Sequence, residues 1–155
     1  MARLLSRYLP LVAWLVFISY ASSASFSAEN TSRIIGPLVL WLFPNTSPET
    51  LAVIHFIVRK IAHFTEYAIL AWLAARAFRA SPRPAVANRW LLAALALVMI
   101  YALIDEYHQS YVPSRTASIF DSLIDMSGGL VMLIILRLRH KNRAGHFKHS
   151  RSLSV

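Results

Sequence analysis

The sequence of 155 residues contains no cysteine, which excludes disulfide bonds, thiol catalysis and cysteine metal sites. Charged residues are also scarce. They make up 15% of the chain, against about 25% in an average soluble domain. Apolar residues reach 57%, and they gather in long runs, as in integral membrane proteins. The length corresponds to one domain at most.

Acidic residues are few. The chain has 7 aspartates and glutamates but 16 lysines and arginines, so its net charge is +9. In a soluble protein this excess would suggest a nucleic-acid partner. Here the basic residues flank the apolar runs, so we interpret them as an orientation signal in a lipid bilayer and predict no nucleic-acid partner.

The apolar runs predict an all-α integral membrane domain over residues 1–138, with four transmembrane helices. They lie at about 8–21, 56–78, 90–109 and 118–138. A second interpretation of the first run is a signal peptide, since basic residues precede it and small residues follow. The basic segment 139–155 is predicted to be a disordered cytoplasmic tail.

A shorter apolar stretch, 34–43, contains Gly36-Pro37 and stops at Pro44. It is too short to span a bilayer, so we predict a short interfacial or re-entrant helix after the first span. Ser47 and Pro48 are suited to the N-cap and first position of the next helix.

Orientation follows from the positions of the basic residues. With both termini in the cytoplasm of a bacterial cell, twelve of the 16 lie inside. They are Arg3, Arg7, Arg76, Arg79, Arg83, Arg89, Arg137, Arg139, Lys141, Arg143, Lys148 and Arg151, whereas Arg33, Arg59, Lys60 and Arg115 lie outside.

This topology brings polar residues of three spans together. Lys60, His63 and Tyr67 share one helical face, with Glu66 beside it. Because spans alternate in direction, this face should meet the end of the third span and the start of the fourth. The predicted outward-facing polar pocket comprises Lys60, His63, Glu66, Tyr67, Asp105, Glu106, His108, Gln109, Arg115, Asp121 and Asp125.

Five carboxylates in this group (Glu66, Asp105, Glu106, Asp121 and Asp125) face three fixed cations (Arg59, Lys60 and Arg115), which leaves two negative charges in excess. Protonated histidines, a neutral carboxylic acid or a bound cation would remove this excess. His63 and Glu66 have a spacing compatible with metal ligands. We favour an ion-pair network joining three helices, and predict neither a metal nor a cofactor.

Three segments resemble the VanZ-like family, whose founding member is associated with resistance to the lipid-bearing glycopeptide teicoplanin. They are Lys60-x-x-His63-Phe64-x-x-Tyr67-x-x-Leu70, then Asp105-Glu106-x-His108-Gln109, then Val112-Pro113-x-Arg115 with Asp121 and Gly128. Ser114, Asp125 and Met132 depart from the family pattern. The resemblance implies a small multi-pass protein of the cell envelope, but no reaction.

Three functions fit these observations. The first is control of the access or binding of an extracytoplasmic amphiphile, such as a lipoglycopeptide or a lipid-linked cell-wall precursor. The second is a membrane-embedded transferase or hydrolase that uses the carboxylates and histidines for acid–base catalysis. The third is a small transporter or proton relay. Whether the chain is an enzyme stays open at this stage.

Overall fold

The computed structural model describes residues 2–23, 28–112 and 118–152, in which every regular element is a helix. The helices are α1 (Ala2–Ala21), α2 (Ala28–Leu42), α3 (Pro48–Arg79), α4 (Pro84–Asn88), α5 (Trp90–Gln109) and α6 (Ile119–Ser152). The predicted all-α class is confirmed.

Two helix boundaries agree closely with the sequence prediction. Helix α5 covers the predicted third span, 90–109. Helix α3 begins at Pro48, and the Ser47 side chain caps it by accepting a hydrogen bond of 3.2 Å from the Thr50 amide. The N-cap prediction is therefore confirmed, because a hydroxyl satisfies an amide that has no partner within the helix.

Three elements differ from the prediction. Helix α2 is 15 residues long and includes Pro37. The short helix α4 was not predicted; Pro84 suits its first turn because the first amides of a helix need no internal acceptor. Helix α6 continues to Ser152, whereas we predicted disorder from residue 139. Each added residue gains a backbone hydrogen bond once a helix has formed.

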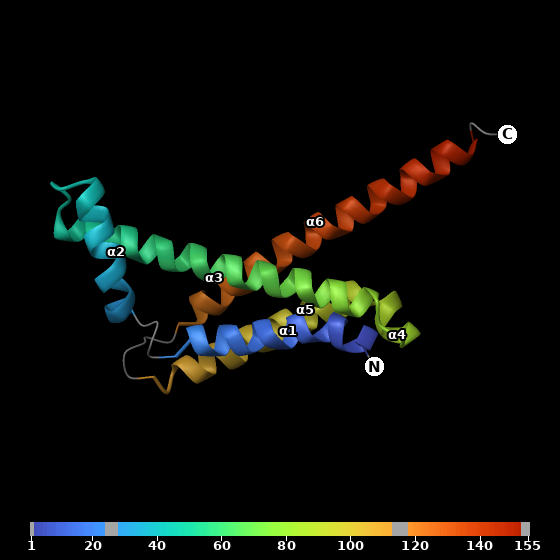
Figure 1. The fold of residues 1–155 in the computed structure, drawn as a ribbon, viewed down its shortest axis with the longest axis horizontal. Helices are drawn as coiled ribbons and strands as arrows, with labels where there is room; N and C mark the ends of the chain where they lie inside the picture. Colours follow the sequence, from blue (N-terminus) through green and yellow to red (C-terminus); the bar gives the residue numbers. More distant parts are fainter. Residues whose placement is uncertain (1, 24–27, 113–117, 153–155) are drawn as a thin grey trace.

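The four longer helices α1, α3, α5 and α6 alternate in direction, and α3 contacts the other three (Figure 1). At one end, Arg7 donates a hydrogen bond of 2.6 Å to the carbonyl of Ala80. At the same end, a guanidinium nitrogen of Arg79 lies 3.4 Å from His140 Nδ1. At the other end, Gln109 donates to Ser22 over 3.4 Å. There, α2 also packs against the beginning of α3.

Small residues allow close packing along this assembly. Ala71, Ala74 and Ala94 are fully buried. A Cβ added at Gly128 would overlap the backbone of Phe64, and one at Gly129 would lie 2.5 Å from Val98 Cγ1. The absence of side chains at these two positions therefore permits the close helix packing.

Among the described residues, two segments are long and apolar enough to cross a membrane, Trp90–Gln109 and Ile119–Asn142. In each, only 28% of the tested residues are buried inside the protein, and large apolar side chains such as Ile100 and Ile134 are exposed. Core helices of soluble proteins bury theirs. The stretches Leu5–Ala21 and Thr31–Leu42 are apolar but shorter. These features indicate a membrane protein.

Candidate functional site

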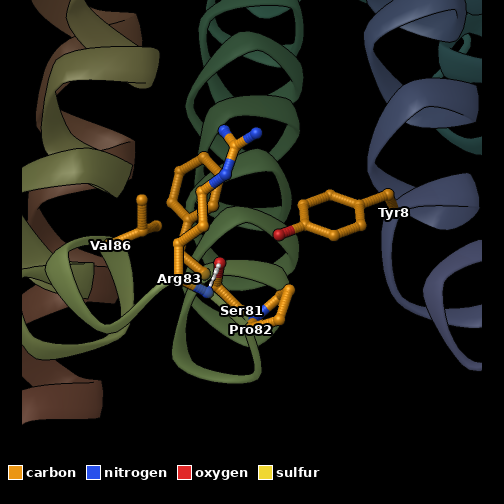
Figure 2. A pocket seen from close by; sticks show the side chains of 6 residues that line it. Tyr8, Ser81, Pro82, Arg83 and Val86 are labelled. Carbon is orange, nitrogen blue, oxygen red and sulfur yellow. Dashed lines mark hydrogen bonds between the residues drawn. The ribbon is translucent and has the colours of Figure 1, made fainter.

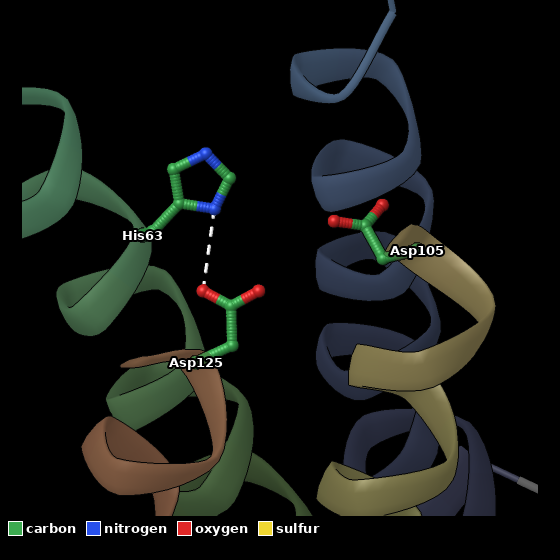
Figure 3. A group of neighbouring side chains, drawn as sticks. All are labelled: His63, Asp105 and Asp125. Carbon is green, nitrogen blue, oxygen red and sulfur yellow. Dashed lines mark ion pairs between the residues drawn. The ribbon is translucent and has the colours of Figure 1, made fainter. Parts of the chain in front are cut away.

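The centre of the candidate site is formed by His63 of α3, Asp105 of α5 and Asp125 of α6 (Figure 3). One potential ligand atom from each side chain lies within 4.8 Å of the others. His63 Nδ1 is 3.2 Å from Asp125 Oδ1, a distance typical of an ion pair when the imidazole is protonated. The Asp105 carboxylate faces both side chains. Residues separated by up to 62 positions thus share one site.

Helical periodicity places further polar residues against this centre. Gln109, one turn after Asp105, donates a hydrogen bond of 2.9 Å to Asp105 Oδ2. Tyr67, one turn after His63, is fully buried, and its hydroxyl interacts electrostatically with Asp105 and Asp125. That hydroxyl is without a hydrogen-bond partner among the described residues.

The site is enclosed by protein. The exposed fraction is 4% for Asp105, 3% for Gln109 and 1% for Asp125, while the His63 side chain is 12% exposed. Carboxylates held away from water are unfavourable unless charge or hydrogen bonds compensate them. We name His63, Tyr67, Asp105, Gln109 and Asp125 the buried polar cluster.

Two further contacts lie beside the cluster, on its side toward the α2 end of the molecule. Lys60 forms an ion pair with Asp121, one helical turn before Asp125. Glu106 accepts a hydrogen bond from the Ser118 amide. Lys60 and Asp121 keep 22% and 17% of their side chains exposed, so this pair forms the edge of the site. The predicted counter-ion role of Lys60 agrees with this contact.

The other predicted residues are not members of this set of five. His108 is exposed, because it turns to the side of α5 opposite Glu106 while Asp105 and Gln109 face inward. Glu66 contributes a backbone carbonyl that accepts a hydrogen bond of 2.9 Å from Trp14 Nε1. Arg115 lies outside the described residues.

Sequence reasoning missed two buried serines. Ser22 is 1% exposed and accepts the hydrogen bond from Gln109. Ser122 is fully buried, and its hydroxyl lies 3.4 Å from the carbonyl of Ala102. The position of Ser122, three residues before Asp125, is a signal that could have placed it on the face toward the cluster.

A pocket of about 450 Å³ lies between the start of α1 and the connection from α3 to α4, away from the polar cluster. Figure 2 shows its lining from close by. Tyr8, Ser81, Pro82 and Arg83 contribute to its lining, and the Arg83 amide donates a hydrogen bond to the Ser81 hydroxyl. This pocket is separate from the polar cluster. Its surroundings are the basic end of the protein, where Arg7 binds Ala80.

Antiparallel helices with outward apolar faces and a polar cluster at their centre define an α-helical membrane protein. A family model described as VanZ/LLP1 matches residues 6–140, and the chain belongs to this VanZ-like family. The family prediction is thus confirmed. No curated protein and no solved structure matches the chain.

Proposed function

We propose that the protein spans the bacterial cell membrane four times, with both termini in the cytoplasm and the α2 end outside. The positions of twelve of the 16 basic residues support this orientation. Contacts between Arg7 and Ala80, and between Arg79 and His140, support grouping the N-terminus, the α3–α5 connection and the middle of α6 at one end.

Introduced cysteines test this orientation cleanly, because the natural chain has none. Asn45→Cys and Ala85→Cys replace exposed residues near opposite ends. A membrane-impermeant maleimide should label Asn45→Cys on intact cells and Ala85→Cys only after lysis. Labelling in the reverse pattern would refute the proposed orientation.

The function that we propose is control of the access or binding of an extracytoplasmic amphiphile. One observation carries this proposal: apolar side chains are exposed at the α2 end of the molecule, the end toward which Lys60 and Asp121 form the edge of the polar site. Trp41, near the end of α2, is 77% exposed, and Phe43, directly after α2, is 63% exposed. A molecule with an acyl chain and a polar head would match an apolar surface beside polar groups. Membership of the VanZ-like family supports the same ligand class, because the founding member of the family is associated with teicoplanin resistance.

Binding of teicoplanin and of its deacylated core to the purified protein tests this function. We expect the acylated form to bind at least about tenfold more tightly, since several methylene groups would leave water. Trp41→Ala should weaken binding of the acylated form. Trp72→Ala is the matched control, because Trp72 is 45% exposed in the second half of α3. Equal affinity for both forms would contradict the proposal.

The contact between His63 and Asp125 supports an alternative, an enzyme that acts on a lipid-linked envelope substrate. A carboxylate 3.2 Å from an imidazole orients the ring, as in general acid–base catalysis. Lipid mass spectrometry of cells that express the protein or His63→Gln at equal levels tests this alternative. A lipid product that requires His63 would favour the enzyme, and identical lipid profiles would argue against it.

A further inference from the structure

We propose that His63, Asp105 and Asp125 bind a divalent transition-metal ion of the Zn²⁺ type. One imidazole and two carboxylates form a mixed nitrogen and oxygen set that suits such ions. The three residues come from α3, α5 and α6, so a bound ion would join three helices at the centre of the molecule.

The distances between the potential ligand atoms are close to those of a metal site. Zn²⁺ binds nitrogen and oxygen at about 2.0–2.2 Å, so two ligands of a tetrahedral ion lie about 3.4 Å apart. His63 Nδ1 and Asp125 Oδ1 are 3.2 Å apart. All three ligand atoms lie within 4.8 Å of one another. The longest of the three separations exceeds the tetrahedral spacing by at most about 1.4 Å, so a movement of the Asp105 carboxylate of that order would complete the set.

Charge within the cluster favours a cation. Asp105 and Asp125 are both buried, and the nearby Lys60 is engaged by Asp121. Gln109 gives Asp105 a hydrogen bond but no positive charge. Protonation of His63 alone would leave one negative charge between the two carboxylates, whereas a divalent ion with neutral His63 balances both.

The surroundings also resemble the support of a metal site. Asp105 Oδ2 receives the Gln109 amide over 2.9 Å, which fixes the carboxylate in the way that ligand-supporting residues do. The buried Tyr67 hydroxyl, without a hydrogen-bond partner in the described part of the chain, interacts electrostatically with both carboxylates. It is available to bind a water molecule or anion on the ion.

Metal analysis of the full-length protein in detergent, purified without chelators or metal-affinity resin, tests the proposal. We expect about one transition-metal ion per chain, as in a mononuclear site. After chelation and gel filtration, added Co²⁺ should give the visible absorption of a low-coordinate site with nitrogen and oxygen ligands. Added Zn²⁺ should abolish that absorption by competition.

Variants separate a metal site from an ion-pair network. Asp125→Asn and His63→Gln should lose the bound ion and the Co²⁺ absorption. Asp121→Asn is the matched control. It removes a carboxylate that lies one turn before Asp125 on α6 and that pairs with Lys60, whereas Asp125 contacts His63. It should keep both. Gln109→Leu should weaken metal affinity by about 10–100-fold.

Measurements of metal content and Co²⁺ absorption on the wild-type protein alone can overturn the proposal. Folded, monodisperse protein that contains no transition metal and gives no Co²⁺ absorption when Co²⁺ is added would exclude the site. Equal metal loss in Asp121→Asn and Asp125→Asn would also exclude it, since binding would then follow overall negative charge. These outcomes are independent of teicoplanin binding, so this proposal and the proposed function can fail separately.

Discussion

Gly128 of α6 is packed directly on the backbone of Phe64 in α3, so that a Cβ at position 128 would overlap the Phe64 carbonyl oxygen and lie 2.9 Å from its carbonyl carbon. Phe64 follows His63, and Gly128 comes three residues after Asp125. The absence of one side chain therefore sets the separation of the two helices beside the polar cluster.

Gly128→Ala should destabilise the protein by about 1–3 kcal/mol, because backbone atoms cannot rotate away from the added methyl group. The change in the free energy of unfolding is measured by titrating a denaturing detergent into the protein in a mild detergent. Gly36→Ala is the control: its Cβ would meet only Leu51 Cδ2, at 3.9 Å. That variant should be neutral or slightly more stable, since alanine favours a helix by up to about 1 kcal/mol. An equal loss of stability in both variants would show that the close approach of α6 to the Phe64 backbone does not account for the effect of Gly128→Ala.

Lys60 and Asp121 should be coupled in a double-mutant cycle. Lys60→Met leaves Asp121 without its ion pair, and Asp121→Asn leaves Lys60 without a carboxylate. We expect the double variant to lose less stability than the sum of the single variants, by about 0.5–3 kcal/mol. The same unfolding assay measures all four proteins. Additive losses would show that the pair contributes no stability.

Gln109→Leu should cost about 1–3 kcal/mol, because it removes the amide that donates to the buried Asp105 carboxylate. Ser22→Ala should cost less, since the contact of Ser22 with Gln109 is 3.4 Å long. Unfolding of both variants with the metal-binding groups otherwise intact measures the difference. A larger loss from Ser22→Ala would reverse the order of importance that the distances indicate.

The contact between α2 and α3 should weaken at acidic pH. His55 Nε2 lies 2.9 Å from Thr31 Oγ1, and burial, followed by the nearby Arg59 charge, lowers the pKa of His55 below its ordinary value of 6.5. The unfolded segment therefore binds the proton more readily than the folded one. Stability is full above pH 6.5 and falls as the pH drops from there toward the lowered folded pKa.

Hydrogen exchange of residues 31–42 at several pH values measures this change. Exchange should accelerate as the pH falls below 6.5 after correction for the intrinsic rate. His55→Gln should remove the acceleration, while His108→Gln, which changes an exposed ring, should leave it in place. Retention of the acceleration in His55→Gln would assign the effect to another group.

Local sequence signals predicted much of this fold. The run of apolar residues before Asp105 predicted the position of α5, and the pair Ser47-Pro48 predicted where α3 begins. Alternation of helices then predicted that residues near His63, Asp105 and Asp121 would meet. These predictions succeeded because charge, proline and hydrophobic length constrain a helix within its own segment.

Details that depend on helix rotation could not be predicted in this way. The sequence does not show that Gln109 faces Asp105 while His108 faces outward, because both lie within one turn of α5. Partner choice was also open: Asp121 binds Lys60, while Asp125 contacts His63. Both carboxylates lie on one face, and only the register of α6 against α3 separates their roles.

Helix α3 has 32 residues and is therefore about 48 Å long, whereas the hydrocarbon layer of a membrane is about 30 Å thick. No proline or glycine interrupts it after Pro48. The exposed arm to which α2 is attached and the segment that carries His63 thus belong to one continuous rod. A tilt of the first part of α3 would therefore also displace the segment that carries His63, because no break in the helix lies between them.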